Sequence, residues 1–252
     1  MLIANSVLVA TSAAEPRDCL SNQYRFASTI ERIIDGDTVE LIDNRQVRII
    51  GINTLELNDK FDSNRRWAET ATARLRNLVK DQKVFLVPGV DTHDRHGRLL
   101  AHIVTIDEKD VAARLVSEGL ALAVAIGRNT RCANDNQALE SIARSEQKGI
   151  WKKPGRWLHR SSAPGNLSRG FFVILSEVSS EVYSNEASAL QLANGLTVTF
   201  SRGMRQKYSS WLATLENLKG MLVEVRGWIN HSSTGTSTLV LHHPSSLSIV
   251  TR

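Results

Sequence analysis

Short runs of apolar and polar residues, separated by turn-forming residues, dominate the first half of the chain. Residues 28–41 read STIERIIDGDTVEL, in which β-branched residues flank the tight turn Asp35-Gly36-Asp37. Such a pattern predicts a β-hairpin. Further strands are predicted at 46–52, 83–87 and 99–106, each rich in Val, Ile or Leu and bounded by turn signals.

Three stretches between and after these strands show helical spacing instead. Residues 62–79 carry apolar side chains three and four positions apart, as one face of a helix requires. A second helix is predicted between Asp110 as its N-cap and Gly119 as its stop, and a third at 137–148. The order of three strands, a helix, two strands and two helices predicts a small Greek-key barrel of the oligonucleotide-binding kind.

The second half repeats the strand-rich pattern after a Pro-, Gly- and Ser-rich segment, 154–167, which we expect to be a linker. Strands are predicted at 171–182, 196–201, 221–228, 238–242 and 247–251, with a helix at 207–218. The predicted fold class is therefore mainly β with α (α+β), with two tandem five-stranded OB-fold-like barrels. The first would span 30–153, after an N-terminal segment at 15–29, and the second 168–252.

Charge adds a preference for an anionic partner. The 252 residues carry a net charge of +5, and residues 29–153 hold 20 Lys and Arg against 19 Asp and Glu. Residues 154–252 hold 9 against 5, so the excess lies in the last third. A basic balance suits a phosphate-rich partner without identifying one. No apolar run approaches the roughly 18–20 residues that span a bilayer, so we expect no membrane insertion.

The N-terminus and the two cysteines bear on the compartment. Residues 1–14 are largely apolar and small, as in a signal peptide, but lack the usual positive start. We favour a signal, and hence a secreted or periplasmic protein; a plain apolar tail would leave it cytoplasmic. Cys19 and Cys132 are a possible disulfide, which needs an oxidising compartment. Two free thiols remain the alternative.

Three segments place charged residues at the ends of predicted strands, namely 35–38, 48–56 and 94–98. Cleavage of a phosphodiester needs cations where negative charge develops, and arginine offers a planar fork for phosphate oxygens. A hard metal ion needs oxygen ligands, and a carboxylate can orient or deprotonate the attacking water. All of these residue types occur in the three segments.

The ordered strings IIDGDTVEL, VRIIGINTLE, DRHGRLLAHI, GLA and a final GIW resemble the staphylococcal (thermo)nuclease family over about half of the chain. The resemblance implies a calcium-dependent nuclease that hydrolyses DNA and RNA with little sequence specificity, with single strands preferred. It implies Arg48, Glu56 and Arg98 as catalytic residues, the two arginines gripping the phosphate. It implies Asp37, Asn53 and the carbonyl of Thr54 as ligands of Ca2+.

Several positions depart from the family pattern. Asn53 stands where the family has a second metal-binding aspartate, which should weaken calcium binding. Leu55 replaces a proline, Ala125 and Gly127 replace two tyrosines that pack on the nucleotide, and His96 replaces a third tyrosine. These changes favour an alternative: a catalytically weak or inactive nuclease-like module that binds single-stranded nucleic acid or a protein partner. The second barrel would hold single strands by analogy of fold. The oligomeric state is not indicated by the sequence.

Overall fold

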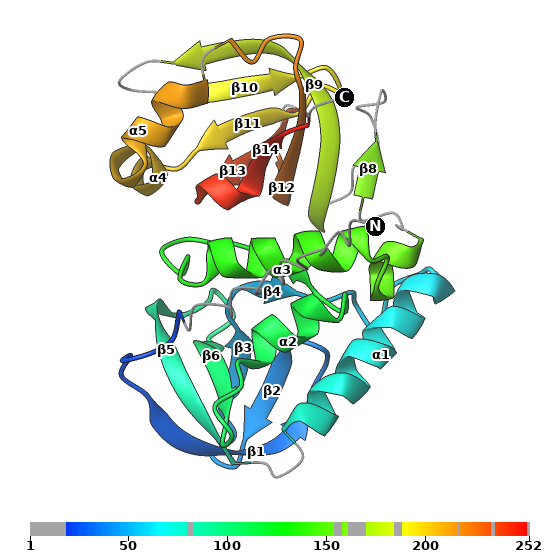
Figure 1. The fold of residues 1–252 in the computed structure, drawn as a ribbon, viewed down its shortest axis with the longest axis vertical. Coiled ribbons are helices and arrows are strands. Elements are labelled where there is room, and N and C mark those ends of the chain that lie inside the picture. Colours follow the sequence, from blue (N-terminus) through cyan, green and yellow to red (C-terminus); the bar gives the residue numbers. More distant parts are fainter. Residues whose placement is uncertain are drawn as a thin grey trace, which may run out of the picture.

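The computed structural model describes residues 19–79, 83–153, 158–160, 170–183, 188–215, 217–232 and 235–250. The predicted leader, 1–14, and most of the predicted linker, 154–167, lie outside these residues. The chain forms two barrel units stacked along its long axis, with helices packed on the first unit and between the two (Figure 1). Among the described helices, none has the length and apolar character to cross a membrane.

The first unit is a closed five-stranded barrel with the strand order β1-β2-β3-β6-β5. Its strands are β1 (Phe26–Ile33), β2 (Thr38–Leu41), β3 (Gln46–Ile49), β5 (Lys83–His93) and β6 (Leu99–Thr105). The pair β1–β2 is antiparallel around the Asp35-Gly36-Asp37 turn, as the hairpin pattern predicted. Strands β3 and β6 pair in parallel and close the barrel between chain segments about 50 residues apart.

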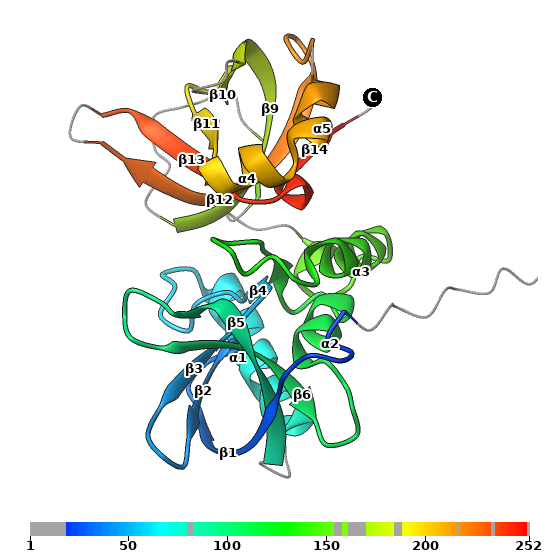
Figure 2. The same cartoon turned by 90° about the vertical axis from the view of Figure 1, so that its left-hand side faces the viewer.

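Three helices flank this barrel: α1 (Asp62–Leu78), α2 (Val111–Ser117) and α3 (Ala133–Ser145), followed by the 3-10 turn η1 (Gly149–Lys152). The predicted cap of α2 is confirmed, since the Asp110 side chain accepts a hydrogen bond from the Ala112 backbone at 2.9 Å. Helix α3 begins four residues before its predicted start, directly after Cys132. It lies between the two barrels (Figures 1 and 2).

The predicted strand 46–52 is broken in two. After β3 the chain passes through Gly51, whose φ of +86° favours glycine, and enters β4 (Ile52–Asn53). Strand β4 pairs with β7 (Leu122–Ala123) in a two-residue ladder outside the barrel. Asn53 in β4, and Thr54 directly after it, are therefore outside the strand that carries Arg48.

Strand β5 also departs from the prediction, because it continues past Pro88 to His93 instead of stopping at residue 87. Proline lacks the backbone N–H that a strand neighbour needs. Strand β1 pairs with β5 only as far as Leu86, so Pro88 faces no β1 acceptor, while it still lies opposite Ala101 of β6.

The second unit is a sheet that closes on itself. Its elements are β8 (Leu158–Arg160), β9 (Gly170–Tyr183), β10 (Ser188–Leu192), β11 (Thr197–Phe200), α4 (Arg202–Lys207), α5 (Ser209–Leu212), η2 (Ala213–Leu215), β12 (Leu222–His231), β13 (Ser237–Leu241), η3 (Pro244–Ser246) and β14 (Leu247–Ile249). The sheet order is β14-β12-β13-β11-β10-β9-β8, and β12 also pairs with β9. Strands β9, β10, β11, β13 and β12 thus form the second five-stranded barrel.

Two predictions for this unit were wrong in detail. The segment 247–251, expected to complete the barrel, contributes β14, which pairs with β12 outside the ring. The fifth member is β10, whose sequence SALQL contains no β-branched or aromatic residue and so gave no strand signal. The single helix expected at 207–218 is instead the short helices α4 and α5 and the turn η2.

Each barrel has its own apolar core, and a further buried cluster spans both units. The shared cluster contains Leu55 and Leu122 of the first unit and Val173 of the second, together with Ile150 and Trp151 from the turn after α3. The two units are therefore docked through buried apolar contacts as well as joined by the chain.

Candidate active site

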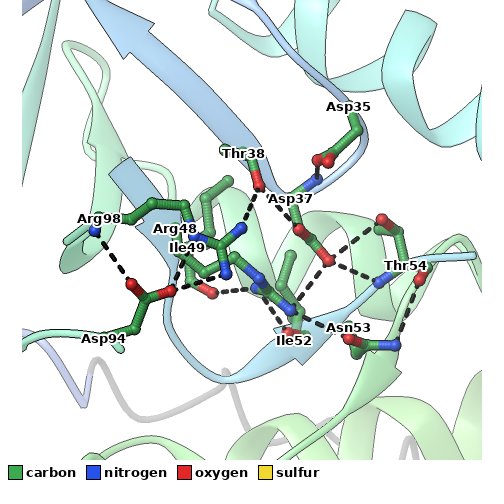
Figure 3. Close-up of polar contacts among 10 residues, drawn as sticks. All are labelled: Asp35, Asp37, Thr38, Arg48, Ile49, Ile52, Asn53, Thr54, Asp94 and Arg98. Atoms are coloured by element: carbon green, nitrogen blue, oxygen red, sulfur yellow. Dashed lines mark hydrogen bonds and ion pairs between the residues drawn. The ribbon is translucent and has the colours of Figure 1, made fainter. Parts of the chain in front are cut away.

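One end of the first barrel gathers the predicted catalytic segments. Thr38 of β2 lies opposite Arg48 of β3, and Arg48 lies opposite Leu100 of β6, two residues beyond Arg98. Strand pairing alone therefore brings the β1–β2 turn, β3 and the β5–β6 turn together. Figure 3 shows their polar side chains converging on one small region.

Asp37 is the buried centre of this region, with only 6% of its surface exposed. Its Oδ2 accepts hydrogen bonds from the Thr54 backbone N at 2.8 Å and the Thr54 hydroxyl at 3.2 Å. The close approach depends on Gly36, where a Cβ would lie 2.8 Å from Thr54 Oγ1 and 2.9 Å from Ala71 Cβ. Glycine in the turn thus lets the Asp37 carboxylate reach Thr54.

Arg48 is held on several sides by the protein itself. Its Nη2 lies 3.0 Å from Asp37 Oδ2 and donates to Asn53 Oδ1 at 3.1 Å. Its Nη1 donates to the carbonyl oxygens of Ile49 at 2.7 Å and Ile52 at 2.9 Å. The guanidinium is thereby fixed in position beside the Asp37 carboxylate (Figure 3).

Arg98 is anchored by Asp94, a residue that the sequence analysis did not single out. The Nε and Nη2 of Arg98 each lie 2.7 Å from Asp94 Oδ2, and Asp94 Oδ1 accepts from the Arg98 backbone N at 3.0 Å. Burial opposes the charge of Asp94, but the hydrogen bonds from Arg98 and from the His96 backbone hold its pKa below the ordinary value. The sequence signal that could have identified Asp94 is its position four residues before Arg98, on the other side of a turn.

Thr38 links the two arginines and was also missed. Its hydroxyl donates to Asp37 Oδ1 at 3.1 Å and accepts from Arg98 Nη1 at 3.4 Å. A continuous network therefore runs from Arg98 through Thr38 and Asp37 to Arg48 (Figure 3). The hydroxyl suits this place because it both donates and accepts.

The pKa of Glu56, the third predicted catalytic residue, is shifted by the charged groups of the same region. Desolvation and the negative charges of Asp37 and Asp35 raise the pKa of Glu56. The positive charges of Arg48 and Arg98 act on it in the opposite direction. The structure thus brings Arg48, Arg98 and Glu56 into one electrostatic environment.

The crowding of acids bears on a metal ion. Burial and the charge of Asp37 raise the pKa of Asp35, so the carboxylates at this end repel one another. A divalent cation would relieve that repulsion, and carboxylate and carbonyl oxygens are the donors that calcium prefers. The carboxylate of Asp37 is a donor of this kind.

Asn53 fits less well. Its Oδ1 accepts the hydrogen bond from Arg48, and its Nδ2 donates to the Thr54 carbonyl at 3.2 Å. The amide thus directs its only oxygen to Arg48 and occupies the carbonyl of the other predicted ligand. In the described part of the chain, the one compact group of His, Cys, Asp and Glu atoms is Cys19, Asp110 and Cys132, and its two sulfurs are bonded to each other.

The positions that lack the family's tyrosines are filled in another way. Ala125 is buried, and Gly127 lies against Asp91, whose Oδ2 would be 2.7 Å from a Cβ at that position. Asp91 in turn pairs with Arg128 at 2.6 Å. Because residues 125 and 127 are alanine and glycine, they offer no aromatic ring on which a base could stack.

Cys19 and Cys132 form a disulfide, with their Cα atoms 5.3 Å apart. Of the two alternatives left open by the sequence, the structure contains the bonded one. The bond joins a residue before β1 to the residue that precedes α3, 113 positions later. It ties the start of the first barrel to the helix that separates the two barrels.

Comparisons with known proteins assign the first barrel to a family. A family model described as staphylococcal nuclease homologue matches residues 46–153. Endonuclease YncB of Bacillus subtilis is 34% identical over 140 residues, covering 53% of this chain and 66% of YncB. The SPbeta prophage-derived endonuclease YokF of the same organism is 34% identical over 132 residues, covering 50% of this chain and 44% of YokF.

A thermonuclease of Staphylococcus intermedius is 28% identical over 128 residues, covering 49% of this chain and 75% of that protein. The matches take in about half of this chain, and less than two thirds of the two Bacillus proteins. The family match ends at residue 153, before the second barrel begins.

Proposed function

The chain belongs through residues 46–153 to the staphylococcal nuclease homologue family, and on this premise we propose that it is a nuclease. It would hydrolyse the phosphodiester bonds of DNA and RNA with little sequence specificity, and its activity would depend on calcium. The observation that carries the proposal is the network that joins Arg98, Thr38, Asp37 and Arg48, whose charges also shift the pKa of Glu56.

The proposed chemistry follows from these side chains. Arg48 of β3 and Arg98 of the β5–β6 turn donate hydrogen bonds to phosphate oxygens, stabilising the charge that grows as water attacks phosphorus. Glu56 orients that water and accepts its proton, which its raised pKa favours, while the bond from phosphorus to one sugar oxygen breaks and this leaving oxygen takes a proton from solvent water. Asp37 and the Thr54 carbonyl would hold a calcium ion, which supplies positive charge for the developing phosphorane.

Ala125 and Gly127 stand where the family has tyrosines that pack on the nucleotide, so recognition would rest on the backbone of the nucleic acid. Binding through phosphates is insensitive to sequence and weakens steeply with salt. We propose single strands as the preferred substrate, with the second barrel as a further surface for them, by analogy with other barrels of this kind.

The disulfide supports a location outside the reducing cytosol. Disulfides persist in oxidising compartments, and Cys19 and Cys132 are bonded here. We propose that the protein is secreted or periplasmic, in line with the leader expected at residues 1–14.

One observation favours a second candidate, a nuclease-like module that binds nucleic acid without cutting it. The Asn53 amide covers the Thr54 carbonyl, and Arg48 is engaged with Asp37, Asn53 and two backbone carbonyls. A site so satisfied internally has less capacity to take up a metal and a phosphate.

Cleavage of a labelled single-stranded DNA distinguishes the two. We expect cleavage with calcium, none with chelator, and a kcat lowered by about 10²–10⁴-fold in Glu56→Gln. Glu69→Gln, on the exposed side of α1, is the matched control and should cleave normally. Cleavage that survives both chelator and Glu56→Gln would reject the mechanism, whereas tight binding without cleavage would establish the second candidate.

A further inference from the structure

A buried ionic cluster connects the second barrel to the first. Arg226 of β12 and Glu140 of α3 are 4% and 0% exposed, and Arg226 Nη1 lies 2.7 Å from Glu140 Oε1. Arg226 Nη2 also bonds Glu224 Oε1 at 2.6 Å, and Glu224 is paired with Arg144 of α3 at 2.6 Å. Two arginines and two glutamates thus balance one another between the barrels.

The cluster holds the backbone of one residue of the two-residue ladder. Glu140 Oε2 accepts a hydrogen bond from the Ala123 backbone N at 2.6 Å. Arg226 Nη1 donates to the Ala123 carbonyl at 3.3 Å. Both polar groups of Ala123, the last residue of β7, are therefore held by side chains of the cluster, one of them from the second barrel.

That ladder leads directly to the candidate active site. Ala123 lies opposite Ile52 of β4, and the carbonyl of Ile52 accepts the 2.9 Å hydrogen bond from Arg48 Nη1. The next residue, Asn53, bonds Arg48 Nη2. Three links, all at hydrogen-bond or strand-pair distance, thus separate Arg226 from the arginine expected to grip the phosphate.

An apolar contact acts on the same segment. Leu55, which precedes Glu56, is 8% exposed and belongs to the buried cluster that includes Val173 of β9. The family's proline would stiffen this position through its ring. Here Leu55 is held by burial in a cluster to which the second barrel contributes.

A ladder of two residues is too short to hold its own geometry, so outside contacts must fix residues 52–56. We propose that Arg226 and Glu140 are positioning residues, through which the second barrel holds β4 and hence Arg48 and Glu56 in their working arrangement. The second barrel is then part of the nuclease, in addition to any role in binding. The inference rests on the proposed nuclease function, and it makes a structural prediction that does not depend on catalysis.

The kinetic test uses the full chain and a charge-balanced variant. Arg226→Met with Glu140→Gln removes one charge of each sign and leaves the Arg144–Glu224 pair intact. We expect kcat on a single-stranded oligonucleotide to fall between about 10- and 100-fold, because small misplacements of catalytic groups have effects of this size. The KM should stay within about twofold, because the phosphate-binding groups are retained.

Val198→Ala is the matched control, since Val198 is fully buried in the core of the second barrel and lies outside the ionic cluster. It should lower the melting temperature and leave kcat unchanged. Arg226→Lys keeps the buried positive charge but loses the planar guanidinium, which bonds several partners at once. Its kcat should lie between those of the wild type and the double variant. Equal kcat values for the double variant and Val198→Ala would overturn the proposal.

Hydrogen exchange provides the test that is independent of activity. The Val124 amide donates across the ladder to the Gly51 carbonyl at 3.0 Å. In the double variant its exchange should accelerate at least about tenfold, while the amide of Ile103 in β6 should be unaffected. If exchange is faster in the double variant but the wild type has no nuclease activity, the proposed function is refuted, while the structural connection from the Arg226–Glu140 pair to β4 stands. If the wild type is an active nuclease and the double variant shows unchanged exchange and unchanged kcat, only the connection from the Arg226–Glu140 pair to β4 is refuted.

Discussion

The side-chain amide of Asn53 donates a hydrogen bond to the carbonyl oxygen of Thr54, 3.2 Å away. The orientation is set by Arg48, which needs the amide oxygen as an acceptor at 3.1 Å. An aspartate in this place would still accept from Arg48 but would present its second oxygen toward Thr54. In the proposed calcium site, the neutral residue would therefore supply one carboxylate ligand fewer and would cover the Thr54 carbonyl.

Asn53→Asp should accordingly strengthen calcium binding. It adds a negative charge and frees the Thr54 carbonyl, and both changes raise affinity for a hard cation. We expect the calcium concentration for half-maximal cleavage to fall by about tenfold or more. Asn58→Asp, an exposed change in the same loop, controls for added charge alone. If both variants shift the calcium midpoint equally, residue 53 does not contribute a ligand position.

Asp94→Asn should impair catalysis through Arg98. The carboxylate holds the guanidinium by contacts at 2.7 Å from both Nε and Nη2, and such charged contacts fix geometry better than neutral ones. We expect kcat/KM to fall by about 10- to 100-fold. The control is Asp43→Asn, which disrupts the Asp43–Arg45 pair in an exposed turn of the same barrel. Wild-type kcat/KM in Asp94→Asn would show that Arg98 needs no anchor.

Local patterns in the sequence predicted much of this arrangement. The hairpin at Asp35-Gly36-Asp37 and the order of strands and helices in the first barrel follow from periodicity and turn residues, which act over a few positions. The strings around Arg48 and Arg98 place those residues at one end of the barrel because strand pairing is regular.

Interactions between residues far apart in the chain could not be predicted from the sequence pattern. Nothing in the pattern pairs Arg226 with Glu140, 86 positions apart, or gives Thr38 its bond to Arg98. Asn53 was predicted to offer its amide oxygen to a metal ion, whereas in the structure that oxygen accepts a hydrogen bond from Arg48, which the sequence pattern does not indicate. Strand β10 was missed because pairing with β9 and β11 overrides its weak propensity.

Removing the disulfide should destabilise the first barrel. Cys19 and Cys132 close a loop with a sequence separation of 113, and a bond of this span restricts the unfolded chain strongly. We expect Cys19→Ser with Cys132→Ser to lower the free energy of unfolding by about 2–5 kcal/mol. Urea titration measures this, and reductant should lower the stability of the wild type but not of the variant. A wild type that is insensitive to reductant under denaturing conditions would contradict the assignment.

His102 of β6 should make stability depend on pH. It is 2% exposed, and burial, aided by the charge of Arg131, lowers its pKa to about 4 from 6.5. The unfolded chain therefore binds a proton that the folded protein excludes, so stability is complete above pH 6.5 and falls as the pH drops toward 4. Between pH 7 and pH 5 this one group should lower the free energy of unfolding by about 2 kcal/mol.

The replacement His102→Gln tests this, because the amide stays neutral throughout the range. His242 and His243, whose pKa values burial also lowers, will still respond, so the variant should lose only the His102 part of the histidine contribution to the pH dependence. The measurement is urea unfolding of both proteins at pH 7 and pH 5, and the informative quantity is the difference between their pH effects. Equal pH effects in the two proteins would mean that His102 is protonated equally in the folded and unfolded states, contrary to its burial.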